Sequence, residues 1–119
     1  MAESVPIAQR LRSPNLVVLA GDEIAGRSRA EQHAAIASVL TDAACVVEGP
    51  GLTLLLEPLN SRVDHVGTFL DRTAEGLAIL REVASPGVKL LFDAYHALLM
   101  DEDIARELSL RLNLAMRLS

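Results

Sequence analysis

A 36-residue repeat is the feature that most limits how this chain can fold. Proline recurs at Pro14, Pro50 and Pro86, and each proline is followed, after a single Asn or Gly, by a short apolar run. Short continuous apolar runs are typical of strands that are buried on both faces, as in a parallel sheet. A segment long enough for a helix separates each run from the next. The repeat therefore predicts strand–helix units and an α/β fold with right-handed connections.

The spacing of the repeat also indicates a barrel. Eight such units would reach the usual size of a (β/α)8 TIM barrel, roughly 250 residues or more. The 119 residues hold about three units, with strands predicted near 15–21, 52–57 and 88–93. The next strand would be expected to begin at about position 122, beyond Ser119. We therefore expect residues 1–119 to form one partial, incomplete TIM-barrel domain.

Helices are predicted before and between the strands. Ser28 and Glu31 form a capping-box pattern, in which a hydroxyl at the N-cap is followed three residues later by a glutamate. From Leu108 the apolar residues alternate with other residues, which is the period of a strand and not of a helix. The sequence therefore does not assign the tail 108–119 to either one. The predicted helices cover residues 4–12, a segment from Ser28 to about Glu48, a segment that begins at Asp71 or Thr73, and a segment that begins at Asp101 or Asp103.

Two of the predicted strands end on an acid. Glu57 and Asp93 occupy the same position in the repeat, directly after the apolar run. Side chains alternate between the faces of a strand, so Glu57 shares its face with Leu55 and Thr53. We assign that face to the barrel interior, and the two acids to the rim at the carboxyl ends of the strands. Active sites of barrel enzymes lie at that rim.

Composition argues against several classes of protein. The net charge is −5, and the chain has two Phe, one Tyr and no Trp, which is unlike a basic, base-stacking nucleic-acid surface. No apolar run approaches the 18 or so residues that span a bilayer, and the N-terminus lacks the pattern of a signal peptide. A single cysteine, Cys45, fits a reducing compartment. We therefore expect a cytoplasmic protein without nucleic-acid or membrane partners.

The motifs at the strand ends resemble a known family. Glu57-Pro58-Leu59-Asn60-Ser61-Arg62, followed by Phe92-Asp93-Ala94-Tyr95-His96, is similar to the sugar isomerase/epimerase superfamily of xylose isomerase-like TIM barrels. The hydroxypyruvate isomerase branch is the closest match. The resemblance extends from about Ser13 to Leu108, and the two motifs are fairly specific as a pair. It implies that the chain is a central fragment of such a barrel.

The resemblance also implies roles for individual residues. In this family a divalent metal is held by a Glu, an Asp, a His or Gln, and a second Glu. Glu57 matches the first Glu, which is both a metal ligand and an acid/base residue, and Asp93 matches the metal-binding Asp. His96 matches the substrate-binding His, while Asn60 and Arg62 are further candidates for substrate contacts. The remaining ligands belong to later strands, so the ligand set in this chain is incomplete.

These residues suit one kind of chemistry. A carboxylate can move a proton between two carbons beside a carbonyl, and a divalent cation such as Mg²⁺ or Mn²⁺ can stabilise the enediolate intermediate. We therefore predict a metal-dependent isomerase of a small hydroxy-carbonyl acid or sugar, an intramolecular oxidoreductase of the aldose–ketose type. Alone, this fragment is expected to be inactive. The alternatives are a non-catalytic truncated remnant or a fragment that self-associates through open sheet edges, and, third, a nuclease-like member of the same superfamily.

Overall fold

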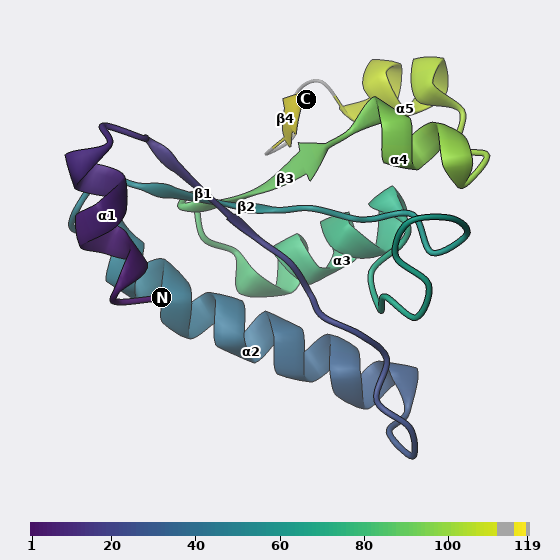
Figure 1. Cartoon of the computed structure of the whole chain (residues 1–119), viewed down its shortest axis with the longest axis horizontal. Helices are drawn as coiled ribbons and strands as arrows, with labels where there is room; N and C mark the ends of the chain where they lie inside the picture. The colour runs from purple at the N-terminus through teal and green to yellow at the C-terminus, as the bar shows by residue number, and fades with distance from the viewer. Residues whose placement is uncertain (112–115, 119) are drawn as a thin grey trace.

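The protein is built on a sheet of four parallel strands. The structure is a computed structural model and describes residues 1–111 and 116–118. The strands pair in the order β1-β2-β3-β4, so each is hydrogen-bonded to its neighbour in the sequence. Figure 1 shows this sheet with helices packed below it and at its ends. The strands are β1 (Asn15–Val18), β2 (Thr53–Leu56), β3 (Val88–Phe92) and β4 (Met116–Leu118).

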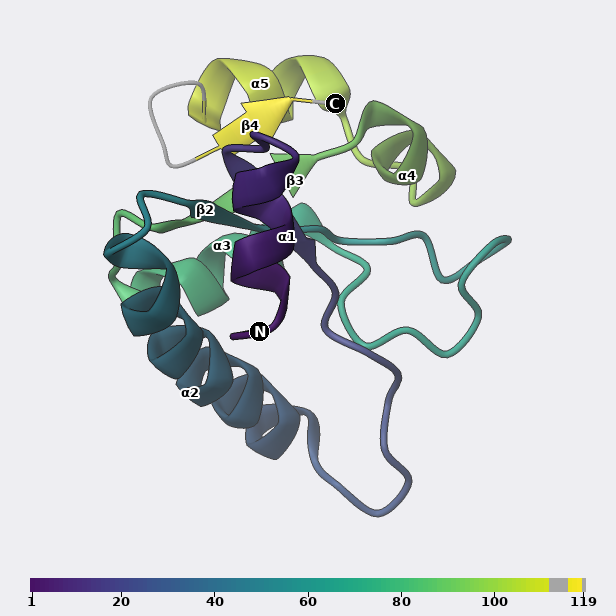
Figure 2. The same cartoon turned by 60° about the vertical axis from the view of Figure 1, so that its left-hand side comes forward.

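The helices lie where a barrel would have them. α2 and α3 cover the same face of the sheet, and α4 and α5 lie beyond the carboxyl end of β3 (Figure 1). α1 lies near the amino ends of β1 and β2, as the turned view in Figure 2 also shows. No helix of the described residues is long and apolar enough to cross a membrane. The helices are α1 (Ser4–Arg10), α2 (Arg29–Glu48), α3 (Thr73–Val83), α4 (Ala94–Leu99) and α5 (Ile104–Arg111).

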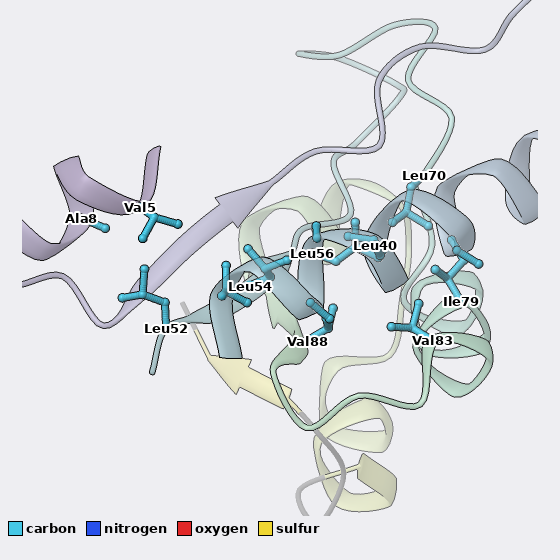
Figure 3. Packing of buried hydrophobic residues seen from close by; sticks show 14 of the residues in the cluster. Val5, Ala8, Leu40, Leu52, Leu54, Leu56, Leu70, Ile79, Val83 and Val88 are labelled. Atoms are coloured by element: carbon cyan, nitrogen blue, oxygen red, sulfur yellow. The ribbon is translucent and has the colours of Figure 1, made fainter. Parts of the chain in front are cut away.

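The hydrophobic core fills the space between the sheet and the helices. Leu54 and Leu56 of β2 and Val88 of β3 point toward this layer and are almost completely buried (Figure 3). They meet Leu40 of α2 and Ile79 of α3. Side chains at full burial each stabilise the fold by about 1.5–3 kcal/mol, so this layer is the main source of stability.

The opposite face of the sheet is less covered. Val17 of β1 pairs in register with Leu55, and Leu55 pairs with Lys89, so these residues form one row across the strands. Val17 is 53% exposed and Leu19 is 56% exposed, whereas Leu55 is buried. The predicted alternation is confirmed on β3, where Val88, Leu90 and Phe92 are buried between partly exposed neighbours. The face that carries Val17 is the one that faces the interior of a barrel.

Most predicted elements are confirmed, with corrected ends. The capping box of Ser28 and Glu31 is present at the start of α2. β1 ends at Val18 rather than at residue 21, because the chain leaves the ladder before Gly21, whose φ is +80°. The helix over 4–12 ends at Arg10. α4 was not expected from the sequence.

The fourth strand begins earlier than expected. β4 starts at Met116, not near position 122, and it pairs in parallel with β3. The reason is the short crossover, since α5 has 8 residues and α2 has 20. The tail therefore contains the end of α5 and a short strand, while residues 112–115 and 119 lie outside the described residues.

The start of α3 differs from the prediction. Neither Asp71 nor Thr73 caps it: the N-cap position is Arg72, which makes no side-chain cap hydrogen bond. The backbone N–H of Thr73 instead donates to Glu102 Oε1 at 2.8 Å, and the Thr73 hydroxyl donates to Glu102 Oε2 at 2.5 Å. Glu102, in the loop between α4 and α5, thus caps a helix that is distant in the sequence. Asp103 caps α5, as one of the two predicted alternatives, by accepting from the N–H of Arg106 at 3.0 Å.

Candidate active site

The two acids of the repeat stand at the same edge of the sheet. Glu57 follows β2 directly, and its backbone N–H donates to the carbonyl of Val18 at 3.2 Å, which holds it beside β1. Asp93 follows β3 and is the N-cap of α4, where its Oδ1 accepts from the N–H of Tyr95 at 2.8 Å. The cap fixes the carboxylate of Asp93, and the first turn of α4 carries His96 back toward Glu57. The adjacent parallel strands therefore deliver both carboxylates to one rim.

Three side chains converge at this rim. Glu57, Asp93 and His96 each offer one ligand atom, and these atoms lie within 4.8 Å of one another. His96 Nε2 lies 4.0 Å from Glu57 Oε1, and the two side chains are only 13% and 16% exposed. The structure thus brings together three of the five predicted site residues. The two carboxylates suit Mg²⁺ or Mn²⁺, and an imidazole nitrogen in the ligand set would broaden the choice to Zn²⁺.

The electrostatics at Glu57 fit a cation. Burial raises the pKa of Glu57, the neighbouring charge of Asp93 raises it further, and His96 and His65 act in the opposite direction. A partly buried carboxylate beside a second carboxylate is costly to ionise. A divalent cation between Glu57 and Asp93 would remove that cost, because it attracts both carboxylates. The residues present therefore fit a divalent metal ion.

Asn60 is completely buried next to this group. Its Oδ1 accepts hydrogen bonds from the backbone N–H groups of Val63 and Asp64, at 3.0 and 2.9 Å. Its Nδ2 donates to Asp64 Oδ2 at 2.9 Å and lies 2.8 Å from His96 Nδ1. Every polar atom of the amide therefore has a partner in the protein. The structure places Asn60 behind His96 and not on an open surface.

Asp64 and Tyr95 extend this network. The hydroxyl of Tyr95 donates to Asp64 Oδ2 at 2.7 Å, and the two partners come from the loop after β2 and from α4. The hydrogen bonds from Tyr95 and from Asn60 lower the pKa of Asp64, and the same contact with Asp64 raises the pKa of Tyr95. The sequence analysis gave neither residue a role. The sequence signals were that Tyr95 lies within the second motif and that Asp64 follows the first motif by two residues.

Arg62 lies apart from the converging group. Its Nη1 donates to the carbonyl of Leu99 at 3.1 Å and forms an ion pair with Asp101. These contacts tie the loop after β2 to the end of α4. His65, in the same loop, is exposed, and its ring centroid lies 5.5 Å from that of His96.

Known proteins of similar sequence are isomerases. The chain is 38% identical over 91 residues to the 2-oxo-tetronate isomerase of Cupriavidus necator, an alignment that covers 76% of this chain and 35% of that protein. It is 27% identical over 109 residues to the hydroxypyruvate isomerase of Escherichia coli, covering 92% of this chain and 42% of that protein. The chain therefore spans less than half the length of these relatives.

Solved structures show the same fold. An AP endonuclease of family 2 from Brucella melitensis superposes with a TM-score of 0.80 at 26% identity, covering 98% of this chain and 47% of that one. The IOLI protein with a bound zinc atom superposes with a TM-score of 0.76 at 18% identity, covering 87% of this chain and 36% of that one. The four parallel strands correspond to part of a complete barrel in these proteins. The family model of xylose isomerase-like TIM barrels matches residues 1–118, and the chain belongs to this family.

Proposed function

We propose that this chain forms part of the active site of a metal-dependent isomerase that acts on a small hydroxy-carbonyl acid, such as hydroxypyruvate. The observation that supports the proposal is the convergence of Glu57, Asp93 and His96 within 4.8 Å at the rim of the sheet. In the proposed site Glu57 and Asp93 hold a divalent cation, and His96 contacts the substrate. The names of the relatives from Cupriavidus necator and Escherichia coli favour this substrate class.

Glu57 is the proposed acid/base residue. In the first step its carboxylate takes a proton from the carbon beside the substrate carbonyl, and the electron pair of that C–H bond forms the enediolate. In the second step the hydroxyl on the deprotonated carbon gives its proton to the former carbonyl oxygen, and the proton held by Glu57 adds to the carbon that carries that oxygen. The hydroxyl and carbonyl groups thereby exchange places, so that the product is an isomer of the substrate. Burial raises the pKa of Glu57 in the metal-free chain, and a bound cation would lower it again, so the role of base is supported by the position of Glu57 at the rim and not by its pKa. A bound cation would supply stabilisation of the negative charge on the enediolate oxygens.

The two proposed substrate-binding side chains, His96 and Arg62, lie at different distances from the rim in this structure. His96 Nε2 lies 4.0 Å from Glu57 Oε1, and a substrate oxygen placed beside both atoms would be in reach of each of them. Arg62 remains a proposed substrate contact, and its guanidinium would have to leave Asp101 and the Leu99 carbonyl to reach the rim. The proposed compartment is the cytoplasm, since the single Cys45 cannot form an intrachain disulfide and fits a reducing compartment.

The chain spans less than half the length of its relatives, so the proposal is tested on the first half of the reaction alone, which is removal of the proton beside the carbonyl. Purified protein is incubated with Mn²⁺ and hydroxypyruvate in heavy water, and proton NMR follows deuterium exchange at the carbon beside the carbonyl. We expect exchange that requires Mn²⁺ and is lost in Glu57→Gln, with no net isomerisation. Glu3→Gln is the matched control, because Glu3 is an exposed acid with no side-chain cap hydrogen bond. Absence of exchange in the unsubstituted chain, or its persistence in Glu57→Gln, would overturn the proposal.

The nuclease alternative rests on the name of one solved structure of similar fold. The net charge of −5 does not favour it, because binding to the phosphate backbone needs a basic surface. Cleavage of a duplex with an abasic site by the purified chain and Mn²⁺, lost in Asp93→Asn, would support the nuclease over the isomerase.

We propose self-association as a second property, with a second copy of this chain as the partner. The observation is an apolar groove of about 510 Å³ beside β1, whose lining includes Val18, Leu19 and Ile36, together with the exposed side chain of Val17 on the same strand. Two copies would supply eight parallel strands, the number in a closed barrel. An open strand edge also favours pairing with another chain.

Sedimentation velocity tests this second proposal. We expect a dimer in the unsubstituted protein, and a monomer in Val17→Lys combined with Leu19→Lys. A chain that stays monomeric at high concentration, or a dimer that the double variant leaves intact, would contradict it.

A further inference from the structure

The orientation of the Asn60 amide is fixed by its surroundings. Two backbone N–H groups, from Val63 and Asp64, point at Oδ1, and an N–H group can only donate. The acceptor end of the amide is therefore identified, and Nδ2 is the end that faces His96. Asp64 Oδ2 accepts one of the two Nδ2 hydrogens at 2.9 Å. The other Nδ2 hydrogen is directed at His96 Nδ1, at 2.8 Å.

Two donors thus meet at one nitrogen of His96. Besides Nδ2, the backbone N–H of Asn60 donates to His96 Nδ1 at 3.1 Å. A ring nitrogen that accepts hydrogen bonds carries no hydrogen, so in the neutral ring the hydrogen resides on Nε2. We propose that Asn60 is a positioning residue that holds His96 in the Nε2–H tautomer.

Asp64 and Tyr95 support this arrangement from behind. Asp64 Oδ2 accepts from both Asn60 Nδ2 and the hydroxyl of Tyr95, so a single carboxylate oxygen links the loop after β2 to α4. Because the carboxylate of Asp64 accepts one amide hydrogen, the amide of Asn60 cannot rotate its donors away from His96. Tyr95 is the residue before His96 and ties the start of α4 to the same oxygen.

The tautomer determines what His96 can do at the rim. Its Nε2–H lies on the side of Glu57, where it can donate a hydrogen bond to a substrate oxygen. Neither ring nitrogen then has a free lone pair, so the neutral ring is a hydrogen-bond donor and Glu57 and Asp93 are left as the cation ligands. The substrate contact rests on the proposed isomerase function, whereas the tautomer does not.

Imidazole nitrogen NMR tests the tautomer directly. Uniformly nitrogen-15-labelled protein is measured by long-range proton–nitrogen correlation at about two pH units above the ordinary histidine pKa of about 6.5. We expect the shift of an unprotonated nitrogen at Nδ1 of His96 and that of a protonated nitrogen at Nε2. His65, which is exposed, serves as the internal reference for a ring that averages its tautomers. A substantial Nδ1–H population at His96 would overturn the proposal, whatever the variants do.

Asn60→Asp separates positioning from structural support. The Asp retains an oxygen that accepts from the N–H groups of Val63 and Asp64, but it replaces the Nδ2 donor with an acceptor. The backbone N–H of residue 60 remains as the only donor to Nδ1, so we expect Nδ1 of His96 to gain hydrogen in part, as a changed nitrogen shift, while the backbone amide spectrum of α2 and α3 is retained. Asn15→Asp, in β1, is the matched control and should leave His96 unchanged. An unchanged His96 spectrum in folded Asn60→Asp would refute the positioning role. Because no step requires turnover, this result and the exchange experiment can fail independently.

Discussion

Glu57 Oε1 and His96 Nε2 lie 4.0 Å apart, although Glu57 directly follows β2 and His96 lies in α4 after β3. The distance is too long for a direct hydrogen bond, so both atoms are available to contact one oxygen of the proposed substrate placed beside them. Asp93 borders the same space, because it caps the helix that carries His96. The geometry favours different roles for the three residues. Glu57 and Asp93 are suited to bind a cation, and His96 is suited to donate a hydrogen bond to the proposed substrate.

The first prediction concerns metal binding by the three converging side chains. We expect Asp93→Asn and Glu57→Gln each to weaken Mn²⁺ binding by about tenfold or more, since each removes a charged ligand. His96→Gln should change Mn²⁺ affinity by less than about twofold. Nδ1 of His96 accepts hydrogen bonds from Asn60 and Nε2 carries the ring hydrogen, so neither nitrogen has a lone pair for Mn²⁺. Isothermal titration calorimetry of the purified chain measures these affinities. A loss in His96→Gln as large as in Asp93→Asn would show that His96 is a ligand.

The second prediction concerns pH and stability without metal. Burial raises the pKa of Glu57 above its ordinary value of 4.5, so the folded chain binds this proton more tightly than the unfolded chain. Stability therefore falls as the pH rises from about 4.5 through the raised pKa. Glu57→Gln removes this dependence, and we expect a higher free energy of unfolding than in the unsubstituted chain at neutral pH, with a smaller difference below pH about 4.

Urea unfolding of both proteins across that pH range, with a chelator present, gives the measurement. Equal stability at neutral pH would show that the Glu57 carboxylate is not destabilised by its surroundings. Added Mn²⁺ should reverse the order, because only the unsubstituted chain keeps both carboxylate ligands.

Much of the fold was predictable because the information is local. The proline repeat located the starts of the strands, and the capping box of Ser28 and Glu31 located the start of α2 within a few residues. The expected barrel class and the family resemblance are confirmed by the match of the family model over residues 1–118. The end of β1 was placed too late, since an apolar residue such as Leu19 continues the pattern without continuing the ladder.

The supporting contacts of the site were not predictable in the same way. The hydrogen bonds from Tyr95 to Asp64 and from Thr73 to Glu102 join residues that are 31 and 29 positions apart. The first also depends on where α4 lies, and α4 has only 6 residues. A short helix with few apolar positions leaves little periodicity in the sequence. Asn60 was assigned to the site, but its burial behind His96 depends on how the loop after β2 folds.

The third prediction concerns the distant cap of α3. Glu102→Ala should lower the free energy of unfolding by about 1 kcal/mol, the usual cost of losing an N-cap. The physical reason is that the N–H of Thr73, which is buried, loses its acceptor. Glu3→Ala is the control, because Glu3 occupies the N-cap position of α1 without a side-chain hydrogen bond and should have a small effect. Similar losses in both variants, measured by urea unfolding, would contradict a specific cap.

The fourth prediction concerns the contact between α3 and β3. A Cβ at Gly76 would lie 2.5 Å from Leu90 Cδ1 and 3.5 Å from Pro58 Cγ. Alanine in a helix is favoured over glycine by about 1 kcal/mol, but overpacking a core costs about 1–3 kcal/mol. Leu90 is completely buried and has little room to move, so the steric cost should exceed the gain and Gly76→Ala should be destabilised.

Gly49→Ala is the matched control for this comparison. Gly49 is the C-cap of α2 with φ of −60°, and nothing lies within 4 Å of its added Cβ. We expect a change in unfolding free energy within about 0.5 kcal/mol for this variant. If Gly76→Ala were as stable as the unsubstituted chain, α3 could shift away from β3 without cost. Pro58, which also faces Gly76, directly follows Glu57, so such a shift would also show that the packing beneath the rim of the candidate site is loose.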